Sequence, residues 1–76
     1  MVDVGNIQII RAQYLGPENC EIRYLMGGKE RVLNGETAVS TLWQPADGYV
    51  RTEGGSFTDA VVIMIQSLGF PGEIVG

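Results

Sequence analysis

The sequence contains no histidine and a single cysteine, Cys20. Without histidine the chain lacks the commonest general base, which excludes Ser-His-Asp and Cys-His nucleophilic catalysis. One thiol forms neither an internal disulfide nor, by itself, a zinc site. No basic residue adjoins Cys20 in the sequence to activate its thiol, so we expect a small apolar side chain in the core.

Basic residues and long apolar runs are also scarce. Five lysines and arginines against nine aspartates and glutamates give a net charge of −4. This balance disfavours nucleic acid, because that affinity comes largely from basic residues at phosphates. No run approaches the ~18 apolar residues of a transmembrane helix, and residues 1–5 lack the basic segment of a signal peptide. We expect a cytoplasmic protein that does not bind membranes.

Motifs for catalysis and for cofactors are missing too. The glycine pairs at residues 27–28 and 54–55 do not fit the phosphate loop G-x-x-x-x-G-K-[ST]. A chain of this length also has little room to surround a substrate and keep a core. We therefore predict that the protein is not an enzyme and has no metal, no cofactor and no small-molecule substrate.

The longest apolar run, residues 60–65, lies between helix signals. Ser56 can accept a hydrogen bond from the first turn, and Asp59 can reach back to the Ser56 N–H. Gly69 suits the left-handed residue that ends a helix, and Pro71 prevents continuation. Although the β-branched residues of the run would also fit a buried strand, the cap, the stop and the length favour a helix over residues 57–68.

Short alternating segments separated by turn residues precede this helix. Strands are expected over residues 7–15, 20–26, 29–33 and 49–52, with turns at residues 16–19, 27–28, 34–35 and 45–48. We expect one face of the first strand to carry Ile10, Ala12 and Tyr14. A two-residue loop at 27–28 pairs Tyr24 with Arg31, and a three-residue loop pairs it with Val32.

Residues 36–44 fit two structures. Their alternation and β-branched content favour a strand, and the alternative is two helical turns with Val39, Leu42 and Trp43 inward. After the helix, residues 72–76 add an edge strand through Ile74 and Val75, or fray. We predict one small α+β domain, residues 1–76, in which an antiparallel meander of about four or five strands packs against one C-terminal α-helix at about residues 57–68.

The predicted helix is apolar around most of its middle. Its core-facing stripe consists of Phe57, Ala60, Val61, Met64 and Leu68. Val62 and Ile63 fall on the other side, near Gln66. Either loops and the C-terminal tail cover them, or they form a surface for a partner or for a second copy.

Because neither disulfides nor a metal stabilise this small chain, oligomerisation or binding to a larger partner becomes more attractive as a source of stability. We predict a non-catalytic protein-binding module that acts as a regulator or inhibitor, of the kind that phages and mobile elements encode. It would occupy a larger protein or self-associate through Val62, Ile63 and Gln66.

Two alternatives use other features. A sheet that binds single-stranded nucleic acid would hold phosphates with Arg23 and Arg31 and stack bases on Tyr24 and Trp43. We favour instead cross-strand pairing of the arginines with glutamates, and burial of the aromatic rings in the core. The other alternative is a structural subunit of a homo-oligomer.

Overall fold

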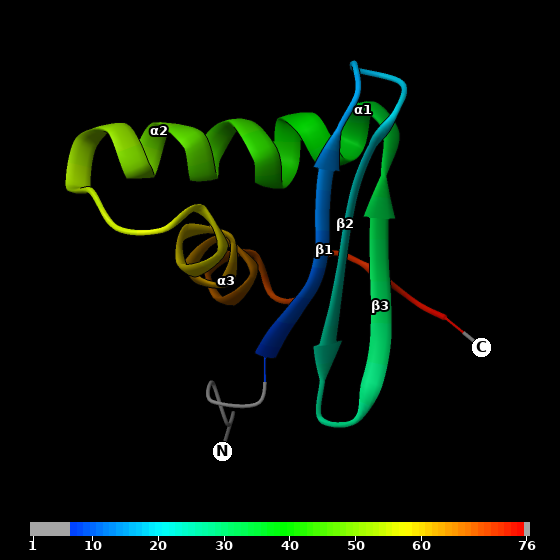
Figure 1. The fold of residues 1–76 in the computed structure, drawn as a ribbon. Helices are drawn as coiled ribbons and strands as arrows, with labels where there is room; N and C mark the ends of the chain where they lie inside the picture. The colour runs from blue at the N-terminus through cyan, green and yellow to red at the C-terminus, as the bar shows by residue number, and fades with distance from the viewer. Residues whose placement is uncertain (1–6, 76) are drawn as a thin grey trace.

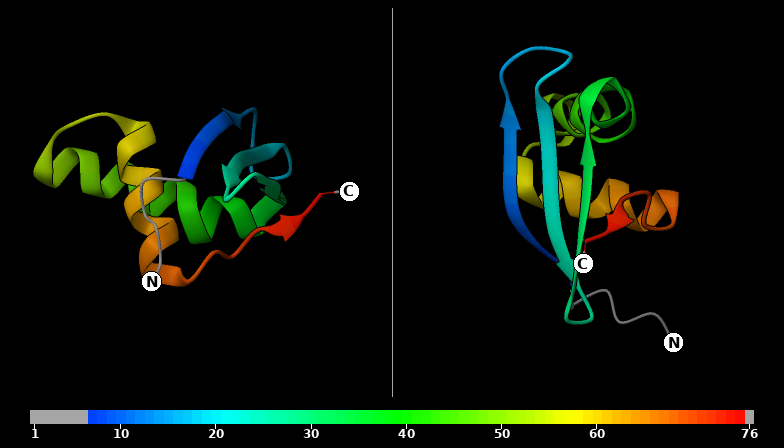
Figure 2. Two further views of the ribbon diagram at one scale, coloured as in Figure 1. Left: turned by 90° about the horizontal axis from the view of Figure 1, so that it is seen from below. Right: turned by 90° about the vertical axis from the view of Figure 1, so that its right-hand side faces the viewer.

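The computed structural model describes residues 7–75. Residues 1–6, which include those used to argue against a signal peptide, and Gly76 lie outside the described residues. Within them, one antiparallel sheet has the order β1-β2-β3-β4. The helices cover one face of the sheet and leave the other open (Figures 1 and 2). The strands are β1 (Ile7–Tyr14), β2 (Cys20–Met26), β3 (Lys29–Asn34) and β4 (Glu73–Ile74). The predicted α+β class is confirmed.

The hairpin between β2 and β3 has a two-residue loop. Gly27 and Gly28 have φ angles of 58° and 80°, which glycine adopts without a steric penalty. Tyr24 therefore pairs with Arg31, and Ile22 pairs with Leu33. This register places Arg31 on the face that the helices cover, since Tyr24 and Ile22 are both buried.

Strand β1 is irregular at Ile10. The register shifts between Ile9 and Arg11, because Ile9 pairs with Tyr24 while Arg11 pairs with Arg23. Ile10 is the extra residue of a bulge and is 46% exposed. Since a bulge shifts the alternation by one residue, the prediction that Ile10 shares a face with Ala12 is wrong. The core face of β1 carries Ile9, Ala12 and Tyr14.

A continuous helix occupies residues 35–53, where the sequence analysis favoured a strand over 36–44, a turn over 45–48 and a strand over 49–52 (Figure 1). These three predictions are wrong. The helix consists of α1 (Gly35–Ala38), a single π-turn η2 (Val39–Trp43) and α2 (Gln44–Glu53). Ala38, Leu42 and Ala46 are fully buried, and their spacing of four residues aligns them on one side of the helix.

The residues at the two predicted turns in this region, 34–35 and 45–48, belong to the start and the interior of the helix. Asn34 is its extended N-cap residue, and Gly35 has a φ angle of 70°. Pro45 has no N–H to donate, and its ring needs space beside the preceding turn. The wider π-turn comes directly before Pro45, and there Gln44 N–H donates to the Val39 carbonyl oxygen. A local widening of this kind accommodates proline within a helix.

The C-terminal helix α3 (Phe57–Leu68) begins and ends where the sequence predicts. Asp59 N–H donates to Ser56 Oγ at 3.1 Å. Gly69 has a φ angle of 76° and donates its N–H to the Ile65 carbonyl oxygen at 3.0 Å. The fully buried residues of α3 are Ala60, Val61 and Ile65. Leu68 is 50% exposed, so its predicted place in the core is wrong.

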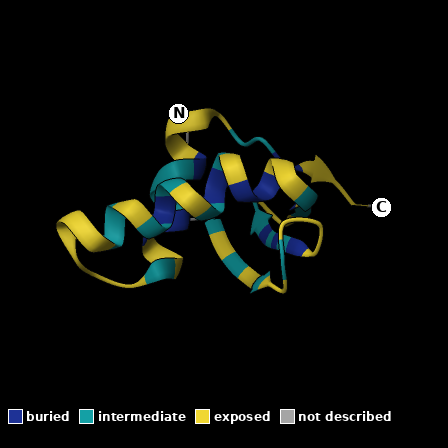
Figure 3. Ribbon diagram, turned by 90° about the horizontal axis from the view of Figure 1, so that it is seen from above, coloured by how far each residue is buried: buried dark blue, intermediate teal, exposed yellow. Residues whose placement is uncertain are grey.

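The core lies where the two helices meet the covered face of the sheet (Figure 3). Tyr24 is fully buried at its centre, and the Tyr24 hydroxyl accepts a hydrogen bond from Gly72 N–H at 3.1 Å. Arg31 Nη1 donates to the Gly72 carbonyl oxygen at 3.0 Å. These two bonds fix the segment after α3 against the sheet. The edge strand expected within residues 72–76 forms over Glu73–Ile74.

We predict that Ser56→Ala lowers the free energy of unfolding by about 1 kcal/mol, because the Asp59 N–H loses its capping acceptor. Urea unfolding followed by circular dichroism measures the change. Ser67→Ala is the matched control, because Ser67 is exposed near the end of the same helix. Equal losses in the two variants would argue against the cap.

We predict that Gly72→Ala destabilises the fold by about 1–3 kcal/mol, through overpacking. A Cβ atom at Gly72 would lie 3.0 Å from Tyr24 Oη and 3.2 Å from the Val32 carbonyl oxygen. Gly48→Ala is the control, since a Cβ there meets no atom within 4 Å and alanine stabilises a helix interior by about 0.5–1 kcal/mol. Urea unfolding should therefore move the two variants in opposite directions.

Candidate functional site

The outer side of α3 carries the three residues predicted to bind a partner. Successive helix residues are about 100° apart around the axis, so Val62 and Ile63 lie on opposite flanks of this side. Asp59 and Gln66 form the ridge between them and are both exposed. Val62 and Ile63 are half-buried. We call these four residues the α3 surface.

The flanking residues of the α3 surface are not among the apolar side chains that pack against the buried core of the described residues. The half-buried apolar side chains that pack against the buried core, within residues 7–75, are Ile7, Ile9, Ala12, Met26, Trp43, Tyr49, Val50, Phe57, Met64 and Phe70. Val62 and Ile63 are not among them. The structure therefore leaves two aliphatic side chains on α3 without a place in the core.

The four residues of the nucleic-acid alternative do not share one face. Tyr24 is fully buried and offers no ring face for stacking. Arg31 lies on the covered face of the sheet, whereas Arg23, next to Tyr24 in β2, lies on the open face. Trp43 belongs to η2 on the long helix.

Two carboxylates hold Arg23 on the open face. Arg23 Nε donates to Glu21 Oε1 at 3.0 Å, and Arg23 Nη1 donates to Glu30 Oε2. Both hydrogen bonds raise the pKa of the Arg23 guanidinium, and the one to Glu30 has the larger effect. The arginine–glutamate pairing that we favoured is thus present for Arg23, and the charge that a phosphate would need is already engaged.

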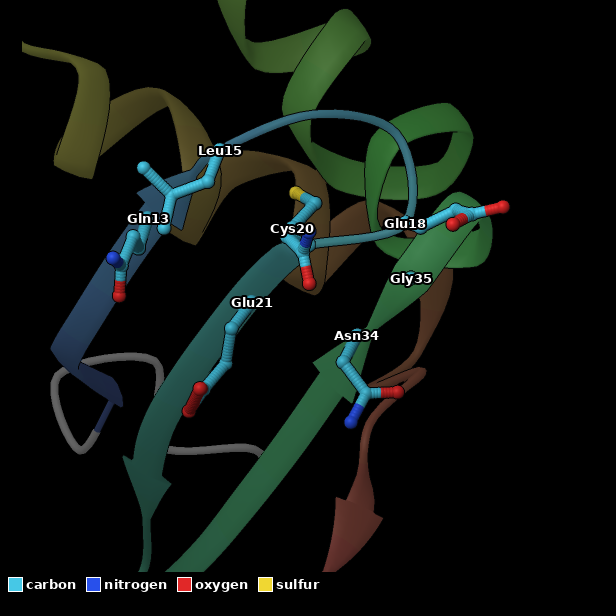
Figure 4. A pocket seen from close by; sticks show the side chains of 8 residues that line it. Gln13, Leu15, Glu18, Cys20, Glu21, Asn34 and Gly35 are labelled. Carbon is cyan, nitrogen blue, oxygen red and sulfur yellow. The ribbon is translucent and has the colours of Figure 1, made fainter.

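A polar hollow lies where β1, β2 and β3 meet the β1–β2 turn (Figure 4). It has a volume of about 450 Å³, is open to solvent, and is lined by Gln13, Leu15, Glu18, Asn19, Cys20, Glu21, Asn34 and Gly35. The sulfur of Cys20 points toward the helices and away from the Glu21 carboxylate (Figure 4). Within residues 7–75 no three His, Cys, Asp or Glu side chains are arranged to hold a metal ion.

Three aromatic rings meet at the end of β1, in an arrangement that the sequence analysis did not anticipate. The ring centroids of Tyr14 and Trp43 are 5.3 Å apart, and those of Trp43 and Phe57 are 4.4 Å apart. Tyr14 is 41% exposed, and the adjacent Leu15 is 71% exposed. We call Tyr14, Trp43 and Phe57 the aromatic cluster. Its members come from a strand and from two helices. Of the two predictions for residues 36–44, only the helical alternative turned Trp43 inward as part of a helix.

Comparison of the chain with protein-family models, with curated proteins and with solved structures finds no match. Among the described residues, no helix is both long enough and apolar enough to cross a membrane. The α3 surface and the aromatic cluster are the two features of the described residues that point to an interaction.

We predict that the Cys20 thiol of the folded protein reacts with Ellman's reagent at least about 100-fold more slowly than in the urea-unfolded chain. Cys20 is free and buried, and this burial raises the pKa of its thiol, which lowers the thiolate fraction at neutral pH. Absorbance at neutral pH follows the reaction. Rapid modification of the folded chain would show that Cys20 is an accessible thiol.

Proposed function

We propose that this chain is a non-catalytic protein-binding module and that the α3 surface is its contact surface. The observation that most supports the proposal is the position of Val62 and Ile63. They flank a polar ridge on the outside of a helix whose core contacts are made by other residues. Aliphatic side chains beside exposed polar groups are typical of a small interface.

A second copy of the chain is the occupant that the α3 surface fits. If two α3 helices lie antiparallel about a two-fold axis between Val62 and Ile63, each Val62 faces Ile63 of the other copy. The same axis sets Asp59 opposite Gln66 of the other copy. The carboxylate then meets an amide donor, and the two aspartates stay apart.

Such a dimer would be weak and reversible. Full burial of one Val or Ile side chain contributes about 1.5–3 kcal/mol, and Val62 and Ile63 are already half-buried. Association costs about 4–15 kcal/mol in lost freedom of motion. A copy held this weakly can be exchanged for a larger protein, so we propose that the module regulates or inhibits by occupancy. We place it in the cytoplasm, where a free cysteine stays reduced.

We predict that Val62→Lys and Ile63→Lys abolish self-association and leave the fold intact. A lysine on either flank brings a charge into the apolar contact, whereas lysine is a better helix former than valine or isoleucine. Sedimentation equilibrium over a wide concentration range measures the mass, and circular dichroism measures the fold. Thr52→Lys, at an exposed position of α2, is the control and should associate as the parent chain does.

Two results would contradict the proposal in different ways. Unfolding of Val62→Lys and Ile63→Lys would show that these side chains are required for the core. A parent chain that stays monomeric at millimolar concentration would exclude the second copy as occupant.

A further inference from the structure

We infer that the free edge of β1 binds an extended segment of a partner protein as an added strand, and that a carboxylate of this segment lies beside Arg11. The edge is separate from the α3 surface, so it extends the proposed function to a second site. It also gives the partner a defined chemistry.

Strand β1 is the last strand of the sheet on its side, and within residues 7–75 no other strand pairs with its outer edge. Every second residue of an edge strand directs its N–H and C=O groups outward, where another strand can pair with them. The opposite edge belongs to β4, which has two residues. The longer open edge of the sheet is therefore that of β1.

The bulge at Ile10 restricts where an added strand can pair. From Arg11 to Tyr14 the register with β2 is continuous, so the backbone of this part is regular. At a bulge the strand bends and the pairing is disrupted. The bulge therefore divides the edge into two regular parts, residues 7–9 and residues 11–14. We place the added strand along the longer part, residues 11–14, which ends at the aromatic cluster.

The charges on the open face favour an acidic residue in that strand. Arg11 stands directly opposite Arg23, and like charges in this position are destabilising. Both Glu21 and Glu30 are bound to Arg23. Arg11 is exposed and, among the described residues, makes no ion pair. A carboxylate on the next strand would supply the missing partner.

The covered face of the sheet supplies the apolar half of the site. The helix of residues 44–53 extends past β1 on this face (Figures 1 and 2). The aromatic cluster lies at the same end of β1, with Tyr14 from the strand and Trp43 and Phe57 from the helices. Inward side chains of an added strand would contact these rings, and Trp and Tyr are common among the residues that dominate binding energy. The partner segment thus alternates apolar residues with polar ones, one of which is acidic.

The β1 strand of a second copy does not meet this requirement. Strand β1 has no acidic residue, so pairing of two β1 strands about a two-fold axis brings no carboxylate to Arg11. It instead brings the two Arg11 side chains toward each other. Our inference therefore assigns the segment to a different protein, and not to a second β1.

The test uses two synthetic eight-residue peptides in which valine alternates with threonine, and in which one central threonine is replaced by glutamate or by lysine. Trp43 is the only tryptophan, so its fluorescence reports binding at the aromatic cluster. At low salt the glutamate peptide should bind about three- to tenfold more tightly than the lysine peptide. Hydrogen exchange of the outward-facing amides among residues 11–14 should slow on binding.

Arg11→Glu should reverse this preference between the peptides. Lys29→Glu, at an exposed position of the β2–β3 hairpin, changes the charge equally and should preserve the preference. A glutamate peptide N-methylated at alternate amides cannot form the strand bonds and should bind at least about tenfold more weakly.

Either of two results would overturn the inference. One is that no peptide changes the Trp43 emission or the exchange of residues 11–14. The other is that the outward-facing amides of residues 11–14 are already protected in the free chain at concentrations where it self-associates, because a second copy would then occupy the edge. Neither result depends on Val62 or Ile63, so the α3 surface is tested independently.

Discussion

Tyr24 connects the sheet to the C-terminal segment through both parts of its side chain. Its ring fills the centre of the core, and its hydroxyl accepts the Gly72 N–H. Arg31, which pairs with Tyr24 across the hairpin, binds the carbonyl of the same glycine. Because the chain after α3 is held at this point, α3 stays across the sheet and β4 can pair with β3. Glycine leaves room for this close approach, since a Cβ atom at this position would lie only 3.0 Å from the Tyr24 hydroxyl oxygen.

The parts of the fold that could be predicted are those with local signals. Ser56 and Gly69 bound α3 because a hydroxyl and a flexible backbone are needed at its two ends. The glycine pair at residues 27–28 specified a hairpin in the same way. The helix of residues 35–53 was only the alternative over residues 36–44, where alternation and β-branched residues favoured a strand, and Pro45 and Gly48 are turn residues by local preference. The burial of Ala38, Leu42 and Ala46 outweighs that preference, and only the packed structure shows it.

The two candidate sites also differ in whether local sequence signals could predict them. The α3 surface could be proposed from helical periodicity alone, because Val62 and Ile63 fall outside the stripe that faces the core. The edge site could not. It depends on the bulge at Ile10, which sets Arg11 opposite Arg23, and on a helix where a strand was favoured, which brings Trp43 to Tyr14. No spacing in the sequence encodes these contacts between distant segments.

An open sheet edge is a hazard, since it can pair with any exposed strand. In this protein the bulge at Ile10 interrupts the regular edge of β1 between Ile9 and Arg11. The positive charge of Arg11 then repels the Arg11 of a second β1 and attracts a carboxylate on an acidic strand. This one charge thus favours an acidic partner strand over self-pairing. The net charge of −4 does not prevent this, because carboxylates near Arg11 are bound to Arg23 and interactions beyond a Debye length of about 8–10 Å are screened. Selectivity at the edge is therefore set by the immediate neighbours of Arg11 rather than by the charge of the whole chain.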